Sequence, residues 1–149
     1  MSVNYKQLDR INKTLENFPS AKLQIVTKNR DIKIIKELIE NGYSLFGENK
    51  VQEANEKFKD LNSSNLDLHL IGPLQTNKVK LALRLFNTIQ SIDREKLVNE
   101  IVKVKNKSEI KTVDFFIQVN IGEEEQKSGV LPNNLERLYN GFIKKYWPK

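Results

Sequence analysis

Apolar positions along the chain follow two alternating spacings, one typical of helices and one typical of strands. Between Val3 and Phe18 they recur every three to five residues, which predicts a helix. The segment Lys22–Thr27 is rich in β-branched residues and predicts a strand. Asp31 is placed to cap the next helix and Asn41-Gly42 to close it, since glycine is common just past a helix end.

The same order of strand and helix repeats along the rest of the chain. The pattern predicts strands at Tyr43–Phe46, Leu66–Gly72, Thr88–Ser91 and Val113–Ile121. It predicts helices at Val51–Leu61, Asn77–Phe86 and from a cap at Asp93 to about Lys105, with a turn at Gly47-Glu48-Asn49 and a loop at Asn62–Asn65. Strands that alternate with helices are typical of parallel βαβ units, so the fold class is α/β. Two architectures remain open, a doubly wound sheet and part of a (β/α)₈ barrel.

Candidate binding residues follow the predicted strands, because both architectures place their chemistry at the carboxyl ends of the strands. Lysine, asparagine, serine and glutamine dominate these positions. Lys28, at the end of the first strand, is the candidate nucleophile, since a lysine amine can form a Schiff base with a carbonyl. Position alone favours the plainer alternative, a solvated lysine at a strand end, because the chain has 25 basic residues.

Composition excludes several kinds of chemistry. The chain has no cysteine, so it has no disulfide, thiolate metal site or cysteine nucleophile. Its single histidine, His69, lies between Leu68 and Leu70 in a predicted strand and is expected to be packed and hydrogen-bonded instead of catalytic. Neither glycine-rich phosphate-binding motif is present. The run Glu123-Glu124-Glu125 is expected to be a solvated loop, so no metal site is predicted.

The net charge of +6 and the pI of about 9.4 permit nucleic-acid binding but do not favour it. The excess is +3, 0 and +3 in residues 1–50, 51–100 and 101–149, so it forms no basic stripe. Lysine-rich solvated helix faces explain the charge better. No apolar run approaches the ~20 residues of a membrane span, and the first residues lack an apolar signal core, so we expect a cytoplasmic protein without a membrane partner.

Five segments resemble the pyridoxal-phosphate homeostasis proteins (YggS/PROSC type), which are related to the N-terminal barrel domain of alanine racemase. They are Ile25–Asp31, Leu45–Phe58, Leu68–Lys80, Ile89–Ile101 and Ile117–Val130. The resemblance covers about residues 3–138 in one domain, whereas residues 139–149 form an atypical tail. It implies a partial (β/α)₈ barrel, with an N-terminal helix and about five βα units.

The same resemblance implies a function in pyridoxal 5'-phosphate (PLP) homeostasis. Lys28 would hold PLP as a Schiff base, without catalytic turnover, and PLP-dependent apoenzymes would be the acceptors. Residues matching family positions near the cofactor are Asn49, Asn77, Ser91 and Asn120, with Lys127 near the mouth. A racemase is the alternative, but it needs a base on each face of the cofactor and no second base stands in a motif. A second alternative is that the chain is a truncated, non-functional fragment.

The chain departs from the family in its extent, because a complete (β/α)₈ barrel needs at least ~200 residues. We therefore expect a truncated barrel without its last three strands and without the phosphate-binding loops that follow strands seven and eight. Weak PLP binding is the expected consequence. The last predicted strand, with Phe115–Ile121, is apolar and uncharged and would form an open edge, so we expect a homodimer or aggregation through that side.

Overall fold

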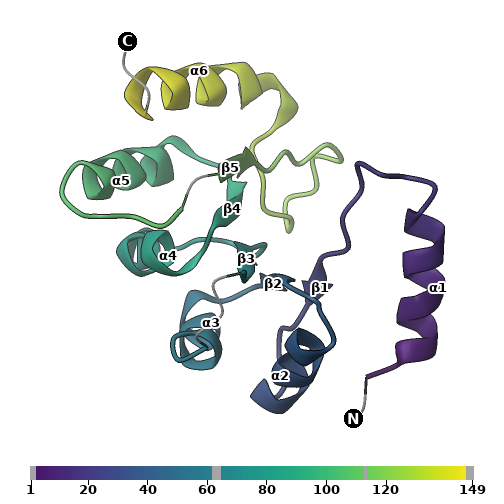
Figure 1. Ribbon diagram of the computed structural model, residues 1–149. Helices are drawn as coiled ribbons and strands as arrows, with labels where there is room; N and C mark the ends of the chain where they lie inside the picture. The colour runs from purple at the N-terminus through teal and green to yellow at the C-terminus, as the bar shows by residue number, and fades with distance from the viewer. Residues whose placement is uncertain (1–2, 62–64, 113, 147–149) are drawn as a thin grey trace.

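The computed structural model describes residues 3–61, 65–112 and 114–146 (Figure 1). The strands are β1 (Ile25–Val26), β2 (Leu45–Glu48), β3 (Asp67–Leu70), β4 (Thr88–Ile92) and β5 (Asp114–Ile117). The α-helices are α1 (Tyr5–Leu15), α2 (Ile32–Glu40), α3 (Val51–Phe58), α4 (Val79–Leu85), α5 (Glu95–Lys105) and α6 (Leu135–Tyr146). Two short 3₁₀ helices, η1 (Thr76–Lys78) and η2 (Pro132–Asn134), precede α4 and α6.

The five strands form one parallel sheet in the order β1-β2-β3-β4-β5. Viewed along the strands, they trace an arc, with α2 to α6 following one another around its outer side (Figure 1). A doubly wound sheet would reverse its strand order at a switch point, and this sheet does not. The partial (β/α)₈ barrel is therefore confirmed, including the N-terminal helix and five βα units.

Local signals place the ends of α2 where the sequence predicts them. The Asp31 side chain accepts a hydrogen bond from the Lys33 backbone N–H at 2.8 Å, which caps the helix. Gly42, with φ of +87°, follows the last turn in the left-handed conformation that glycine adopts at little cost. Both predicted helix signals are confirmed.

Several predicted boundaries are wrong. The last strand, β5, ends at Ile117, four residues before the predicted Ile121, and Val119 instead forms an isolated bridge to Val130. The strand β2 runs two residues past its predicted end, because Gly47 and Glu48 pair with His69 and Leu70 and form no turn. Asp93 does not cap α5; its carboxylate pairs with Arg94, which itself occupies the cap position without a side-chain cap bond. β1 keeps only two residues of its predicted strand. Residues 62–64 of the predicted loop and Val113 of the last predicted strand lie outside the described residues.

The core lies between the outer side of the sheet and the helices. Leu68, Leu70 and Ile89 point to this side and are buried. Alternation along the strands sends their neighbours to the inner, concave side of the arc. Phe115 packs outward against α6, so Phe116 faces inward, where 57% of its surface is exposed. The concave side is thus the less covered face of the sheet.

The segment from Gly141 to Tyr146 continues α6. Phe142 and Tyr146 are buried against Phe115 of β5, with ring centroids 5.4 and 5.0 Å from it. The Lys105 Nζ donates to the Tyr146 carbonyl at 2.6 Å and lies over its ring. This part of the tail is therefore packed into the fold. Over the described parts of the chain, no helix is long and apolar enough to cross a membrane.

Candidate functional site

The parallel topology brings all five predicted cofactor residues to the carboxyl-end rim of the sheet. Lys28 lies in the turn after β1, Asn49 directly follows β2, and Asn77 lies in η1 after β3. Asn120 follows β5, and Ser91 differs from expectation because it lies inside β4, one residue before its end. The rim is therefore built from the ends of every strand, as the barrel architecture requires.

Lys28 is exposed, and its neighbours are tightly held. The Thr27 backbone N–H donates to the Gly47 carbonyl at 3.0 Å, which continues the β1–β2 ladder by one residue. Asn29 has φ of +56°, a left-handed conformation that asparagine tolerates better than most residues. Among the described residues, the Lys28 amine has no hydrogen-bond or ion-pair partner. The amine is therefore available to a ligand.

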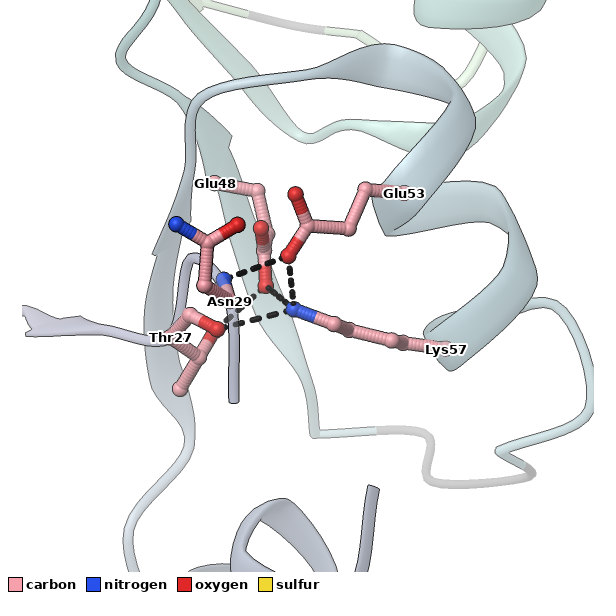
Figure 2. A network of polar contacts seen from close by, with 5 residues as sticks. All are labelled: Thr27, Asn29, Glu48, Glu53 and Lys57. Atoms are coloured by element: carbon pink, nitrogen blue, oxygen red, sulfur yellow. Dashed lines mark hydrogen bonds and ion pairs between the residues drawn. The ribbon is translucent and has the colours of Figure 1, made fainter. Parts of the chain in front are cut away.

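A polar network lies beside this turn and joins it to β2 and α3 (Figure 2). Glu48 Oε1, fully buried at the end of β2, accepts from the Thr27 hydroxyl at 2.7 Å and from Lys57 Nζ at 2.9 Å. Lys57 also donates to the Thr27 carbonyl at 2.8 Å and to Glu53 Oε1 at 2.6 Å. Glu53 Oε1 in turn accepts from the Asn29 backbone N–H at 2.5 Å.

The network favours the ionised form of Glu53. The hydrogen bond from Lys57 lowers the pKa of the Glu53 carboxyl most strongly, and the Asn29 backbone N–H lowers it further against the opposing effect of burial. The second oxygen of Glu48 is buried and has no partner within the described parts of the chain. The sequence predictions missed this network, although the Glu53–Lys57 spacing of four residues is the usual helix ion-pair signal.

The Asn49 backbone lies where the loops after β2 and β3 come into contact. A side chain added at Gly72 would overlap the Asn49 backbone carbonyl, so glycine at this position allows the loops after β2 and β3 to meet. A hollow of about 450 Å³ opens beside them, a size found among small-molecule sites. Its lining residues are Asn49, Lys50, Val51, Gln52, Glu53, Pro73, Gln75 and Lys78.

Asn120 is occupied by its own loop. Its Nδ2 donates to the Glu124 carbonyl at 2.8 Å and its Oδ1 accepts from the Glu124 N–H at 3.3 Å. Gly129, with φ of +127°, lies close to the Asn120 backbone, which leaves no room for a side chain there. Asn120 therefore shapes the loop that lines a second hollow of about 390 Å³, next to Lys127.

His69 lies on the concave side of the sheet in a chain of polar contacts. Its Nδ1 lies 2.8 Å from Gln90 Nε2 and its Nε2 lies 3.0 Å from Asp67 Oδ1. The two contacts join the imidazole to a neighbouring strand and to its own strand. The predicted packed and hydrogen-bonded histidine is confirmed. No group of three metal-ligating side chains occurs among the residues that the structure describes.

Comparison with known proteins identifies similar proteins, although no protein-family model matches the chain. The pyridoxal phosphate homeostasis protein of Aquifex aeolicus (strain VF5) is 40% identical over 136 residues, which cover 89% of this chain and 59% of that protein. The protein of the same name from Escherichia coli (strain K12) is 35% identical over 119 residues, covering 78% and 50%. The chain is a homologue of the pyridoxal phosphate homeostasis proteins.

Solved structures of PipY, described as a COG0325 family member, extend the similarity to the fold. PipY of Synechococcus elongatus PCC7942, solved without PLP, superposes with a TM-score of 0.82 at 29% identity, covering 92% of this chain and 64% of PipY. PipY with PLP bound superposes with a TM-score of 0.76 at 26% identity, with the same coverage. The chain thus spans between 50% and 64% of the length of these four relatives and structures.

The rim residues fit PLP in their chemistry. Lys28 offers an amine for an aldehyde, and Asn49 and Asn77 offer side-chain amides that make no hydrogen bond within the described ranges. The Ser91 hydroxyl is buried and also lacks a partner there. An amine together with amide and hydroxyl donors suits a ligand that carries both a carbonyl and a phosphate. Asn120 differs, because its amide already binds its own loop.

Proposed function

We propose that the chain binds PLP through Lys28 and acts in PLP homeostasis, without catalytic turnover. The observation that carries the proposal is the position of Lys28. Its exposed amine lies at the carboxyl end of β1, in a fold shared with a homologue whose structure holds PLP. Asn49, Asn77 and Ser91 would donate hydrogen bonds, and Asn120 would shape the neighbouring loop. The cytoplasmic location and the apoenzyme acceptors stay predictions.

When bound, PLP supplies an aldehyde carbon that a neutral amine can attack. The Lys28 nitrogen would form the new bond to that carbon, the carbonyl oxygen would leave as water, and a C=N bond would remain. The free Nζ of Lys28 favours this step, whereas Lys57 directs its three N–H donors to Thr27, Glu48 and Glu53. Lys28 is thus the better nucleophile of the two lysines.

Reductive labelling tests the proposal. The protein is incubated with PLP, reduced with borohydride and digested, and the modified peptide is identified by mass spectrometry. We expect the pyridoxyl group on Lys28, in the wild type and in the control Lys50→Ala, which alters another exposed lysine of the same rim. Lys28→Ala should lose it. Labelling spread evenly over surface lysines and unchanged in Lys28→Ala would contradict the proposal.

A racemase remains the competing function, and the tyrosines argue against it. Tyr5 donates to Glu37 of α2, and Tyr43 accepts from Asn12 of α1, so both lie on the outer side near α1. Tyr139 and Tyr146 lie in α6. None supplies a second base at the rim. Incubation of the PLP-loaded protein with each alanine enantiomer should leave its optical rotation unchanged; racemisation lost in Lys28→Ala would favour the enzyme.

A further inference from the structure

The two neighbours of Lys28 in the chain, Thr27 and Asn29, are both held by hydrogen bonds, as Figure 2 shows. Before it, Thr27 is bound through its hydroxyl to Glu48 and through its carbonyl to Lys57. After it, the Asn29 backbone N–H donates to Glu53. The backbone of Lys28 is thus held between two fixed points, while its amine has no partner among the described residues.

Both anchors converge on Lys57 in α3. An ammonium group has three N–H donors, and those of Lys57 point to Thr27 O, Glu48 Oε1 and Glu53 Oε1 at 2.8, 2.9 and 2.6 Å. No donor remains for a ligand, because two carboxylates and a backbone carbonyl occupy all three. The network therefore has the geometry of a support for the turn and none of the features of a second binding amine.

The anchor at Asn29 holds the residue directly after Lys28 in an uncommon backbone conformation. Asn29 holds a left-handed φ of +56°, which costs energy for any residue other than glycine. A hydrogen bond from its N–H to an ionised carboxylate is among the stronger kinds and offsets that cost. Without it, the turn can relax to an ordinary negative φ, and the Lys28 side chain would leave its present direction.

We infer that Glu53, held in place by Lys57, is a positioning residue for Lys28. The inference rests on the proposed function and deepens it: α3, the second helix after Lys28 in the chain, sets the place of the binding amine. Glu53 does not touch PLP in this inference. It acts through the Asn29 backbone, and its loss slows the addition of Lys28 to PLP without removing the amine.

The rate of borohydride-trapped labelling at Lys28 tests the inference. Glu53→Ala removes the acceptor and keeps a strong helix former, and we expect the rate to fall about tenfold, the equivalent of one charge-assisted hydrogen bond. Glu53→Gln keeps an acceptor oxygen for the Asn29 N–H and should recover most of the rate. Glu56→Ala, an exposed glutamate of the same helix, is the matched control and should label like the wild type.

Two further measurements complete the test. Circular dichroism gives the folded fraction of each variant, and rates are compared per folded molecule. Thr27→Val, which removes the other anchor's hydroxyl at constant shape, should also slow labelling if Glu53→Ala fails to fold. Equal rates in Glu53→Ala and Glu56→Ala, or a Glu53→Gln rate as low as that of Glu53→Ala, would overturn the inference. A wild type without label on Lys28 would instead overturn the proposed function itself.

Discussion

At the scale of single residues, the site depends on one fully buried carboxylate and one lysine. Glu48 has no exposed surface, and Lys57 is its ionic partner at 2.9 Å. Burying a carboxylate costs several kcal/mol unless a cation and hydrogen bonds compensate it. The pair is therefore required by the fold once Glu48 is inside, whatever ligand the rim binds.

Removing Lys57 should destabilise the protein strongly. Lys57→Met keeps the aliphatic part of the side chain but removes the ionic partner of the buried Glu48, so we expect a loss of about 3–5 kcal/mol in the free energy of unfolding. Lys103→Met, which breaks the exposed pair with Glu100, should cost less than about 1 kcal/mol. Urea unfolding measures the free energy of unfolding of both variants. Equal losses of stability would contradict the stabilising role of the buried Lys57–Glu48 pair.

Glu53 should make stability depend on acid pH. Its pKa is lowered in the folded protein, chiefly by the hydrogen bond from Lys57, so folding favours its ionised form. This contribution is complete above the unfolded carboxyl pKa of about 4.3 and is lost as pH falls through the lower folded value. The stability difference between wild type and Glu53→Ala should therefore shrink as the pH falls below about 5. A constant difference over that range would contradict the assigned shift.

At the scale of elements, the rim depends on how closely the loops after the strands approach one another. Gly72, after β3, meets the backbone of Asn49, after β2, at a distance that no side chain allows. The two loops bound the hollow beside Asn49. A small residue in one loop therefore sets the position of a candidate ligand residue in another.

Adding one methyl group at Gly72 should show that the site depends on the close approach of the two loops. Gly72→Ala places its Cβ against backbone atoms that cannot rotate away, and we expect a cost of about 1–3 kcal/mol together with weaker PLP binding. Gly141→Ala is the matched control, because it lies in α6 with open space around it, and should stabilise by about 0.5–1 kcal/mol. Thermal unfolding measures both changes. Unchanged stability in Gly72→Ala would mean that the two loops can move apart at little cost.

At the scale of the whole molecule, the concave side of the sheet is the unusual surface. Val26 and Phe116, both on strands, are exposed there. Apolar side chains on a sheet face are normally covered, because parallel sheets are buried on both sides. This face and the edge strand β5 are where we expect a second copy to bind.

Light scattering at micromolar concentration tests that expectation. The wild type should give a mass above that of the 17.4 kDa monomer. Phe116→Lys should shift the mass toward the monomer, whereas Phe18→Lys should not, although Phe18 is equally exposed at 58% in the segment between α1 and β1. A monomeric wild type with cooperative unfolding would show that the concave face needs no cover.

The sequence by itself determined the order of helices and strands, the α/β class and the position of Lys28 at a strand end. These follow from local signals: periodicity, the Asp31 cap and the glycine after α2, each acting within a few residues. The family motifs added the barrel, which periodicity alone left open. Boundaries failed where pairing between strands prevailed over turn propensity, as it did at Gly47 and Glu48.

Only the tertiary structure decided which polar residues meet. Thr27, Glu48 and Lys57 are separated by up to 30 positions in the chain. No local sequence pattern predicts that the buried Glu48 carboxylate pairs with a lysine of the next helix. The contact of Gly72 with Asn49 and the capture of the Asn120 amide by its own loop likewise depend on how loops cross at the rim. Such contacts arise from packing between elements, because burial and electrostatics act through space and ignore distance along the chain.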